Sequence, residues 1–187
     1  MRRANLGSVV SILFAAIVLS AGCALRSSPI PNAVSNDEYA IYAAWLKQHF
    51  KTRPERLLLA TRTFSFNPMT PGTCNIRSLR QDVDVSFLEA LDKLGDAQYS
   101  IDTQRFDSHE AKIPWSYEAS EGLAANPPPP FQLISFSRVA FNWNRTRAFF
   151  AVDDACGGLC GDGSAVLACR TDGGWTFKRV LSCTWTA

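Results

Sequence analysis

The chain has 187 residues, of which 47% are hydrophobic, so it is about one domain long and can bury a core. Its formal charge of +2 comes from 19 basic and 17 acidic side chains, and removal of a leader containing Arg2 and Arg3 would leave 17 of each. The basic side chains form no cluster along the sequence, so we do not expect a nucleic-acid partner.

The N-terminal residues are typical of a secretory signal peptide. Arg2 and Arg3 form a basic start, residues 9–19 form an apolar core, and three small residues precede Cys23. A transmembrane helix is the alternative. It is the weaker one, because eleven residues of apolar core would span about 16 Å of a hydrocarbon layer that is about 30 Å thick. We therefore expect residues 1–22 to be removed.

Residues 19–23, Leu-Ser-Ala-Gly-Cys, resemble the lipobox of bacterial lipoproteins, with Ser20 at a place where the pattern prefers Leu. The resemblance implies that Cys23 carries a thioether-linked diacylglycerol and becomes the acylated N-terminus. Several acyl chains hold a domain on a membrane durably, so the membrane is the expected partner. Ala24 in place of Asp implies, under the sorting rule of some bacteria, an outer-membrane location facing the periplasm.

A tether and a helix are predicted next. Residues 24–35 are rich in Pro, Ser and Asn, which predicts a lipidated tether over residues 23–35 and a globular domain over residues 36–187. Asn36 can cap a helix that ends before Pro54. Its apolar residues recur at helical spacing and are expected to pack in the core: Tyr39, Ile41, Tyr42, Ala43, Trp45, Leu46 and Phe50.

The middle of the chain predicts a strand, a short helix and irregular segments. Residues 56–66 favour a strand, which two prolines and a glycine in residues 67–72 interrupt. A second helix is predicted after Asp84 or Ser86, with Gly95 as its left-handed C-cap. Residues 97–117 carry only weak strand signals. The four prolines at 127–130 require an extended surface segment.

Residues 133–185 are typical of an antiparallel meander with a glycine-rich loop at 156–163 and a hairpin turn at Asp172-Gly173. With these two turn residues, Cys169 faces Thr176 and Cys183 faces Asp162. The predicted fold class is therefore α+β, with an N-terminal helix and a second short helix packed on a curved antiparallel sheet that ends in a β-meander.

With Cys23 lipidated, the remaining cysteines lie in an oxidising compartment and predict two disulfides and one free thiol. They are Cys74, Cys156, Cys160, Cys169 and Cys183. Cys156 with Cys160 is the first choice, after which Cys74 would pair with Cys169 or Cys183. Cys160 with Cys183 is the rival pairing. Cys169 and Cys183 are not expected to pair, because the hairpin register separates them by about 23 Å.

The glycine-rich loop does not match a known catalytic or metal motif. Three residues separate Cys156 from Cys160, so the Cys-x-x-Cys spacing of thiol-redox sites is absent. Asp153, Asp154 and Asp162 are not spaced as in an EF-hand, and no lysine supports a phosphate site. His49 and His109 are expected to be surface or packing residues. The sequence therefore predicts no catalytic residue, cofactor or metal site.

Residues 137–142, 148–152, 156–163 and 172–175 together are similar to the C-terminal block of uncharacterised bacterial secreted and lipoprotein domains. The resemblance implies no activity. The order of a helix followed by a curved sheet with a tryptophan-bearing hairpin is also loosely similar to cystatin-like and NTF2-like folds.

The predicted function is that of a membrane-anchored envelope lipoprotein with a binding or structural role. The first alternative is a small-molecule pocket between sheet and helix, with or without enzymatic activity. An apolar concavity containing His49, Arg138 or Arg179 with a carboxylate would favour it, and a filled core would favour the first reading. The second alternative is thiol-redox activity at Cys156 and Cys160.

Overall fold

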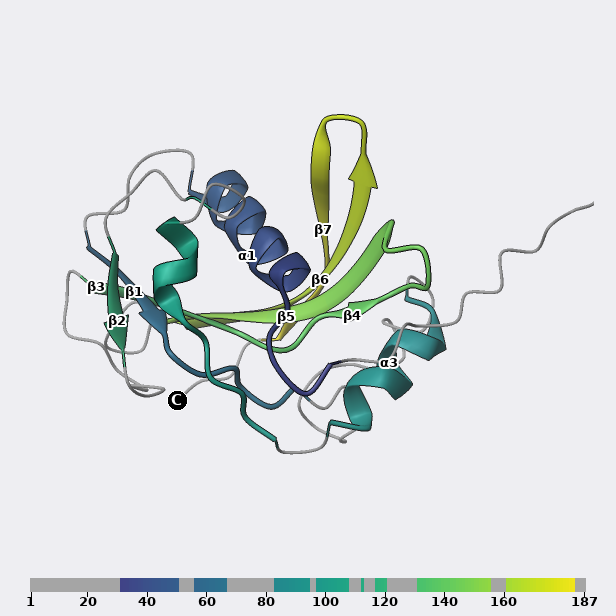
Figure 1. The fold of residues 1–187 in the computed structure, drawn as a ribbon, viewed down its shortest axis with the longest axis horizontal. Coiled ribbons are helices and arrows are strands. Elements are labelled where there is room, and N and C mark those ends of the chain that lie inside the picture. The colour runs from purple at the N-terminus through teal and green to yellow at the C-terminus, as the bar shows by residue number, and fades with distance from the viewer. Residues whose placement is uncertain are drawn as a thin grey trace, which may run out of the picture.

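The computed structural model describes residues 31–50, 56–66, 83–94, 97–107, 112, 117–120, 131–155 and 161–183. They form an α+β fold with two α-helices, one short 3-10 helix and a mixed, open sheet of seven strands (Figure 1). The helices are α1 (Asn36–His49), α3 (Val85–Asp92) and η1 (Thr103–Asp107). The strands are β1 (Arg56–Ala60), β2 (Tyr117–Ser120), β3 (Phe131–Phe136), β4 (Ala140–Phe141), β5 (Arg147–Ala155), β6 (Gly161–Thr171) and β7 (Gly174–Cys183).

The sheet is mixed, so the prediction of an antiparallel sheet is wrong for its first strands. The strand order is β2-β1-β3-β5-β6-β7, and β4 pairs with β5 beside this path. β1 runs parallel to both β2 and β3, whereas β3, β5, β6 and β7 form the antiparallel meander that the alternating residues predict. Leu57, Leu58 and Leu59 of β1 form a continuous apolar run, which is typical of parallel strands and carries no alternation to reveal the partners of the strand.

The N-cap of α1 lies one residue earlier than predicted. Ser35, not Asn36, is the N-cap, and a capping box joins the Ser35 and Glu38 side chains to each other's backbone N–H. The Ser-x-x-Glu spacing specifies this pair directly. Asp37 and Glu38 lie in the first turn, where negative charge stabilises a helix. The apolar stripe of the helix is buried, as predicted.

The elements between α1 and the meander differ in extent from their predictions. The strand expected over residues 56–66 ends at Ala60, and isolated bridges continue it at Arg62 and Phe64. Asp84 caps α3 by accepting from the Ser86 N–H at 2.8 Å. The weak strand signals after residue 97 correspond to η1 and β2.

The two helices cover opposite faces of the sheet (Figure 1). Phe150 on β5 packs in the cluster that contains α1, and its neighbour Phe149 packs in the cluster that contains α3. Successive strand residues point to opposite faces, so both faces of the central strand are buried. The β6–β7 hairpin rises beside α1 on the same side of the sheet (Figure 1).

The hairpin register confirms one predicted pair and corrects the other. Cys169 faces Thr176, as predicted. Cys183 faces Gly163 rather than Asp162, because an irregularity at Ala165/Val166 shifts the register by one residue. An extra residue in one strand of an antiparallel pair is a β-bulge, which a count outward from the turn cannot anticipate.

The folded part reaches further toward the N-terminus than the predicted boundary at residue 36. Val34 is buried in the α1 cluster, and the backbone carbonyls of Pro31 and Ala33 accept hydrogen bonds from Arg138. The last residues of the predicted tether are therefore fixed on the domain. Among the helices that the structure describes, none is long and apolar enough to cross a membrane.

Several predictions fall on residues outside the described ranges. These are the signal peptide 1–22, the lipidation site Cys23, Cys74, the Cys156–Cys160 pair, Gly95, His109 and the prolines at 127–130. Cys169 is a half-buried free thiol. The disulfide pairings stay predictions.

Candidate functional site

A pocket of about 220 Å³ lies between the C-terminal half of α1 and the β6–β7 hairpin. It is lined by Trp45, Gln48 and His49 from α1, Ser164 and Val166 from β6, and Phe177 and Arg179 from β7. Two of the residues named above as signs of a pocket, His49 and Arg179, therefore lie in one lining. Most ligand pockets measure about 300–1,000 Å³, so this one suits a molecule of about one ring.

The periodicities of helix and strand bring these side chains together. Positions 45, 48 and 49 are three and four residues apart and share one helix face. Ser164 and Val166 are two residues apart on β6 and share one sheet face. Val166 lies opposite Arg179 on β7, so the hairpin register adds the guanidinium to the same face.

A His–Asp contact and an Arg–Asp ion pair lie at the sheet side of the pocket. His49 Nε2 lies 3.4 Å from Asp154 Oδ2, and Arg179 Nη1 lies 2.7 Å from Asp162 Oδ2. Asp154 and Asp162 face each other directly across β5 and β6. Like charges at such positions destabilise a sheet, and here each carboxylate has a basic partner from another element. His49 and Arg179 therefore offset the repulsion between the Asp154 and Asp162 carboxylates beside the pocket.

Neighbouring contacts fix the orientation of His49. Trp45 stacks on the imidazole with ring centres 4.3 Å apart and planes 14° from parallel. Gln132 holds the Asp154 carboxylate by donating to both of its oxygens, at 2.8 and 2.9 Å. Gln48 donates to the Trp175 carbonyl and so ties the end of α1 to β7. The imidazole is thus oriented before any ligand arrives.

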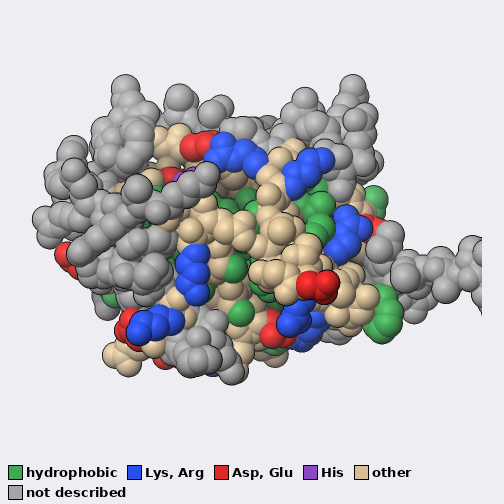
Figure 2. Space-filling view, turned by 90° about the horizontal axis from the view of Figure 1, so that it is seen from above, with side chains coloured by type: hydrophobic (Ala, Val, Ile, Leu, Met, Phe, Trp, Pro, Cys, Tyr) green, Lys and Arg blue, Asp and Glu red, His purple; other side chains and the backbone are tan. Residues whose placement is uncertain are grey.

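The lining favours an anionic or acceptor group attached to an apolar body. Its polar residues Gln48, His49, Ser164 and Arg179 can all donate hydrogen bonds, and it contains no acidic side chain among the residues that the structure describes. Trp45, Val166 and Phe177 supply apolar surface. On the face that Figure 2 shows, charged side chains of both signs are interspersed among the described residues.

The same residues give less support to catalysis or metal binding. A His–Asp pair can orient a general base, but no hydrogen bond joins the Ser164 hydroxyl to His49, both of which are described. Within the described ranges, no three His, Cys, Asp or Glu side chains are grouped so that they could hold a metal ion. Reversible binding is the chemistry that this arrangement supports best.

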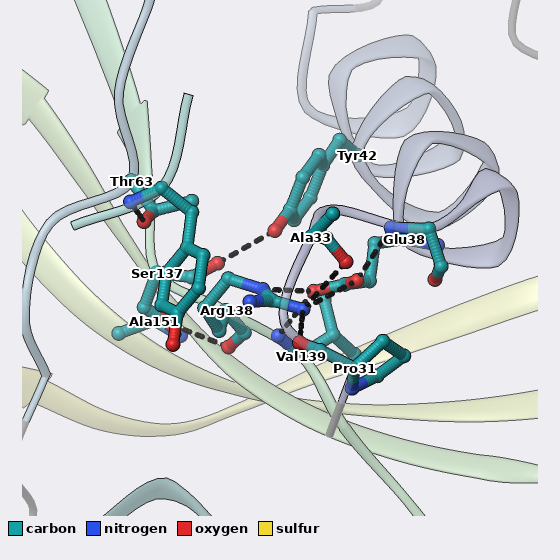
Figure 3. Close-up of polar contacts among 11 residues, drawn as sticks. Pro31, Ala33, Glu38, Tyr42, Thr63, Ser137, Arg138, Val139 and Ala151 are labelled. Atoms are coloured by element: carbon teal, nitrogen blue, oxygen red, sulfur yellow. Dashed lines mark hydrogen bonds and ion pairs between the residues drawn. The ribbon is translucent and has the colours of Figure 1, made fainter. Parts of the chain in front are cut away.

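Arg138, the third residue named as a sign of a pocket, lies elsewhere and forms a buried ion pair with Glu38 (Figure 3). Their side chains are 2% and 0% exposed. Arg138 Nε donates to Glu38 Oε1 at 2.8 Å, and Nη2 donates to Oε2 at 3.1 Å. Two parallel charge-assisted bonds of this kind fix the two side chains relative to each other.

The Arg138 guanidinium joins three parts of the chain. Nη2 also donates to the carbonyls of Pro31 at 2.7 Å and Ala33 at 3.0 Å, and the cation lies 4.3 Å from the centre of the Tyr99 ring. Nη1 is buried without a hydrogen-bond partner. Arg138 therefore holds the start of the domain on the β3–β4 corner and has a structural role.

Next to this pair, Tyr42 and Ser137 join α1 to the sheet. The Tyr42 hydroxyl donates to the Ser137 carbonyl at 2.7 Å, and the Ser137 hydroxyl accepts from the Ala151 N–H at 2.8 Å (Figure 3). Burial raises the pKa of Tyr42 well above its ordinary value of 10.0, and the Glu38 charge adds to this effect.

Five of the seven lining residues were not named as site residues from the sequence. A signal for the site was present. Asp162 and Ser164 occupy β6 positions of the same parity as Val166 and Ala168, on the face that α1 covers, where apolar residues are expected. Polar residues at strand positions whose neighbours of the same parity are buried and apolar therefore indicate a possible pocket.

Comparisons with known proteins give no family for this chain. No family model matches it, no curated protein matches it, and no solved structure matches it. What the protein binds must therefore be argued from its own residues.

Proposed function

We propose that this chain is a lipid-anchored envelope protein, held through Cys23 on the outer membrane and facing the periplasm, and that its folded part binds a small ligand in the pocket lined by His49 and Arg179. The anchor rests on the lipobox-like residues 19–23. The binding role rests on one observation, a concave lining that combines hydrogen-bond donors with aromatic surface between α1 and the β6–β7 hairpin.

The ligand we propose is a small carboxylate with an apolar body of about one ring. Arg179 Nη1 is paired with Asp162, and the other N–H groups of this guanidinium can donate to a ligand carboxylate. The Ser164 hydroxyl provides a further donor in the same lining. The aromatic rings of Trp45 and Phe177 can cover the apolar body.

The order of the elements supports our proposal that the fold is loosely similar to the cystatin-like and NTF2-like folds. α1 packs on a sheet whose β3, β5, β6 and β7 run antiparallel, which agrees with a loose similarity to cystatin-like and NTF2-like folds. Such a likeness concerns the backbone alone and carries no activity to this chain. The proposal therefore names a ligand-binding protein and no reaction.

Equilibrium dialysis with two probes of matched size and opposite charge tests the pocket. Phenylacetate should bind the acylated protein in detergent more tightly than benzylamine does, because the lining includes Arg179 and the neighbouring Asp154 and Asp162 carboxylates already contact basic side chains. Equal binding of both probes, or binding of neither, would contradict the proposed ligand class.

Two variants and one control assign the binding to this pocket. Ser164→Leu adds a bulky apolar side chain to the lining, and Arg179→Gln removes the guanidinium. Each variant should therefore weaken phenylacetate binding at least tenfold, or about 1.4 kcal/mol. Thr176→Leu places the same side chain as the first variant at an exposed position on the other face of β7 and should bind like wild type. Equal affinities of Ser164→Leu and Thr176→Leu would place the binding elsewhere.

The anchor has its own test. The intact mass of protein extracted from membranes should show loss of residues 1–22 and addition of acyl chains. A mass that includes residues 1–22 and no acyl group would contradict the anchor and leave the pocket proposal untouched.

A further inference from the structure

The turn between β4 and β5 presents an exposed tryptophan. Trp143 is 59% exposed, and Val85, at 46%, is the other large hydrophobic side chain that the described residues leave exposed. An indole is amphipathic, with an apolar body and one N–H donor, and tryptophan is enriched where a protein meets the interfacial region of a membrane.

Hydrogen bonds hold this turn in one shape. The Asn142 N–H donates to the Arg147 carbonyl, and the Arg145 N–H donates to the Asn142 carbonyl, both at 3.0 Å. The Asn142 side chain accepts from the Arg147 N–H at 2.8 Å and donates to Thr146 Oγ1 at 3.1 Å. Arg145 closes the turn at φ 54°, a left-handed conformation that non-glycine residues adopt at a cost. The turn therefore presents Trp143 on a rigid support.

The turn lies beside the N-terminal end of α1, near the first described residues. Arg145 forms an ion pair with Asp37 in the first turn of α1, and Figure 1 shows this end of α1 beside β4 and β5. The Pro31 carbonyl is bound close by through Arg138. Residues 24–30 separate Pro31 from Cys23, and these eight peptide steps span at most about 29 Å when fully extended.

The charge near the turn suits an anionic lipid surface. Arg145 and Arg147 belong to the turn and its edge, and the Arg170 N–H donates to the Thr146 carbonyl at 2.8 Å, which places a third arginine beside it. Asp37 offsets one of these charges. Basic residues close to an anionic membrane surface are attracted to it.

We propose that the β4–β5 turn is a second membrane contact, in which the Trp143 indole enters the headgroup region of an anionic phospholipid bilayer. This inference rests on the proposed lipid anchor, which brings the turn within reach of the bilayer. The pocket takes its helical residues from the other end of α1, a helix of 14 residues that is about 21 Å long.

Quenching of tryptophan fluorescence by brominated lipids tests the contact. Acylated protein is reconstituted into vesicles of phosphatidylethanolamine and phosphatidylglycerol, with and without phosphatidylcholine brominated near the headgroup end of its acyl chains. Wild-type emission should be quenched, and Trp143→Ser should lose most of that quenching. Val85→Ser, which removes the other exposed apolar side chain, should be quenched like wild type. Equal quenching of wild type and Trp143→Ser would overturn the inference.

Flotation of the same vesicles separates the two proposals. Protein that fails to float with lipid contradicts the anchor. Protein that floats but shows no Trp143-dependent quenching overturns the membrane-contact inference alone, and leaves Trp143 as a contact for another protein. Replacing phosphatidylglycerol by phosphatidylcholine should reduce the quenching, and unchanged quenching would overturn the role of the arginines.

Discussion

Among single residues, the buried Glu38 carboxylate joins three parts of the fold. It accepts from the Ser35 N–H, from Arg138 Nε and Nη2, and from the Val139 N–H. It therefore caps α1, neutralises the buried arginine and fixes the β3–β4 corner at once. A fully buried carboxylate is tolerated because every one of these donors is in place.

Removing Arg138 should destabilise the protein strongly. In Arg138→Met the Glu38 charge stays buried without its partner, which costs about 3–5 kcal/mol. The double variant Arg138→Met/Glu38→Gln removes both charges and should be less destabilised than the sum of the single variants. Urea unfolding measures both effects. A loss below about 1 kcal/mol in Arg138→Met would show that the pair is not structural.

Tyr42 should make stability fall at alkaline pH. Burial raises its pKa well above 10.0 in the folded state, whereas the unfolded chain loses the phenol proton near pH 10. The stabilisation that comes from the protonated Tyr42 phenol is therefore complete below about pH 10 and is lost as the pH rises further. Tyr42→Phe should cost about 1–2 kcal/mol at neutral pH, because the Ser137 carbonyl loses its donor, and should show a shallower alkaline decline.

Urea unfolding at a series of pH values from neutral to strongly alkaline checks this. Tyr39, whose pKa burial also raises, remains in the Tyr42→Phe variant, so part of the decline should persist. Parallel curves for wild type and Tyr42→Phe would show that Tyr42 does not control the alkaline transition.

At the scale of elements, the β6–β7 turn needs a left-handed residue at one position only. Gly174 has φ 111°, and the preceding Gly173 has no such conformation. Gly174→Ala should cost roughly 1–2 kcal/mol. Gly173→Ala is the matched control, because its added Cβ would meet Thr171 Oγ1 at an ordinary 3.9 Å. Thermal unfolding should separate the two variants, and equal melting temperatures would contradict this reading of the turn.

The elements that the sequence predicts well are those with a clear period. The apolar stripe from Tyr39 to Phe50 and the alternation through β5 and β6 predict α1 and the meander. The parallel pairing of β1 was not predictable, because its apolar run has no alternation and its partners come from distant segments. The N-cap was predictable from Ser35 and Glu38 and was placed one residue late.

The candidate site was predictable only in part. His49 and Arg179 could be named as pocket residues because their side chains are chemically conspicuous, but the sequence could not show that they share a lining. Their meeting depends on the hairpin register and on α1 crossing that face of the sheet, which are tertiary facts. Arg138 was named for the same chemical reason, and its partner Glu38 lies a hundred residues away in sequence.

At the scale of the whole molecule, α1 separates two surfaces. Its N-terminal end holds residues 31–35 and the β4–β5 turn, and its C-terminal end supplies Trp45, Gln48 and His49 to the pocket. The proposed membrane contact uses residues at the first end of α1, and the proposed ligand pocket uses residues at the second end.

The proposed binding of a small carboxylate between α1 and the β6–β7 hairpin can be followed residue by residue. Isotope-labelled, acylated protein is titrated with phenylacetate and observed by two-dimensional NMR. The Trp45 indole and the Ser164 and Arg179 amide resonances should shift with one saturating curve, while the indole resonance of Trp143, which is outside the pocket lining, should stay in place. Shifts confined to residues outside the pocket, or no shift at Trp45, would contradict the proposed binding.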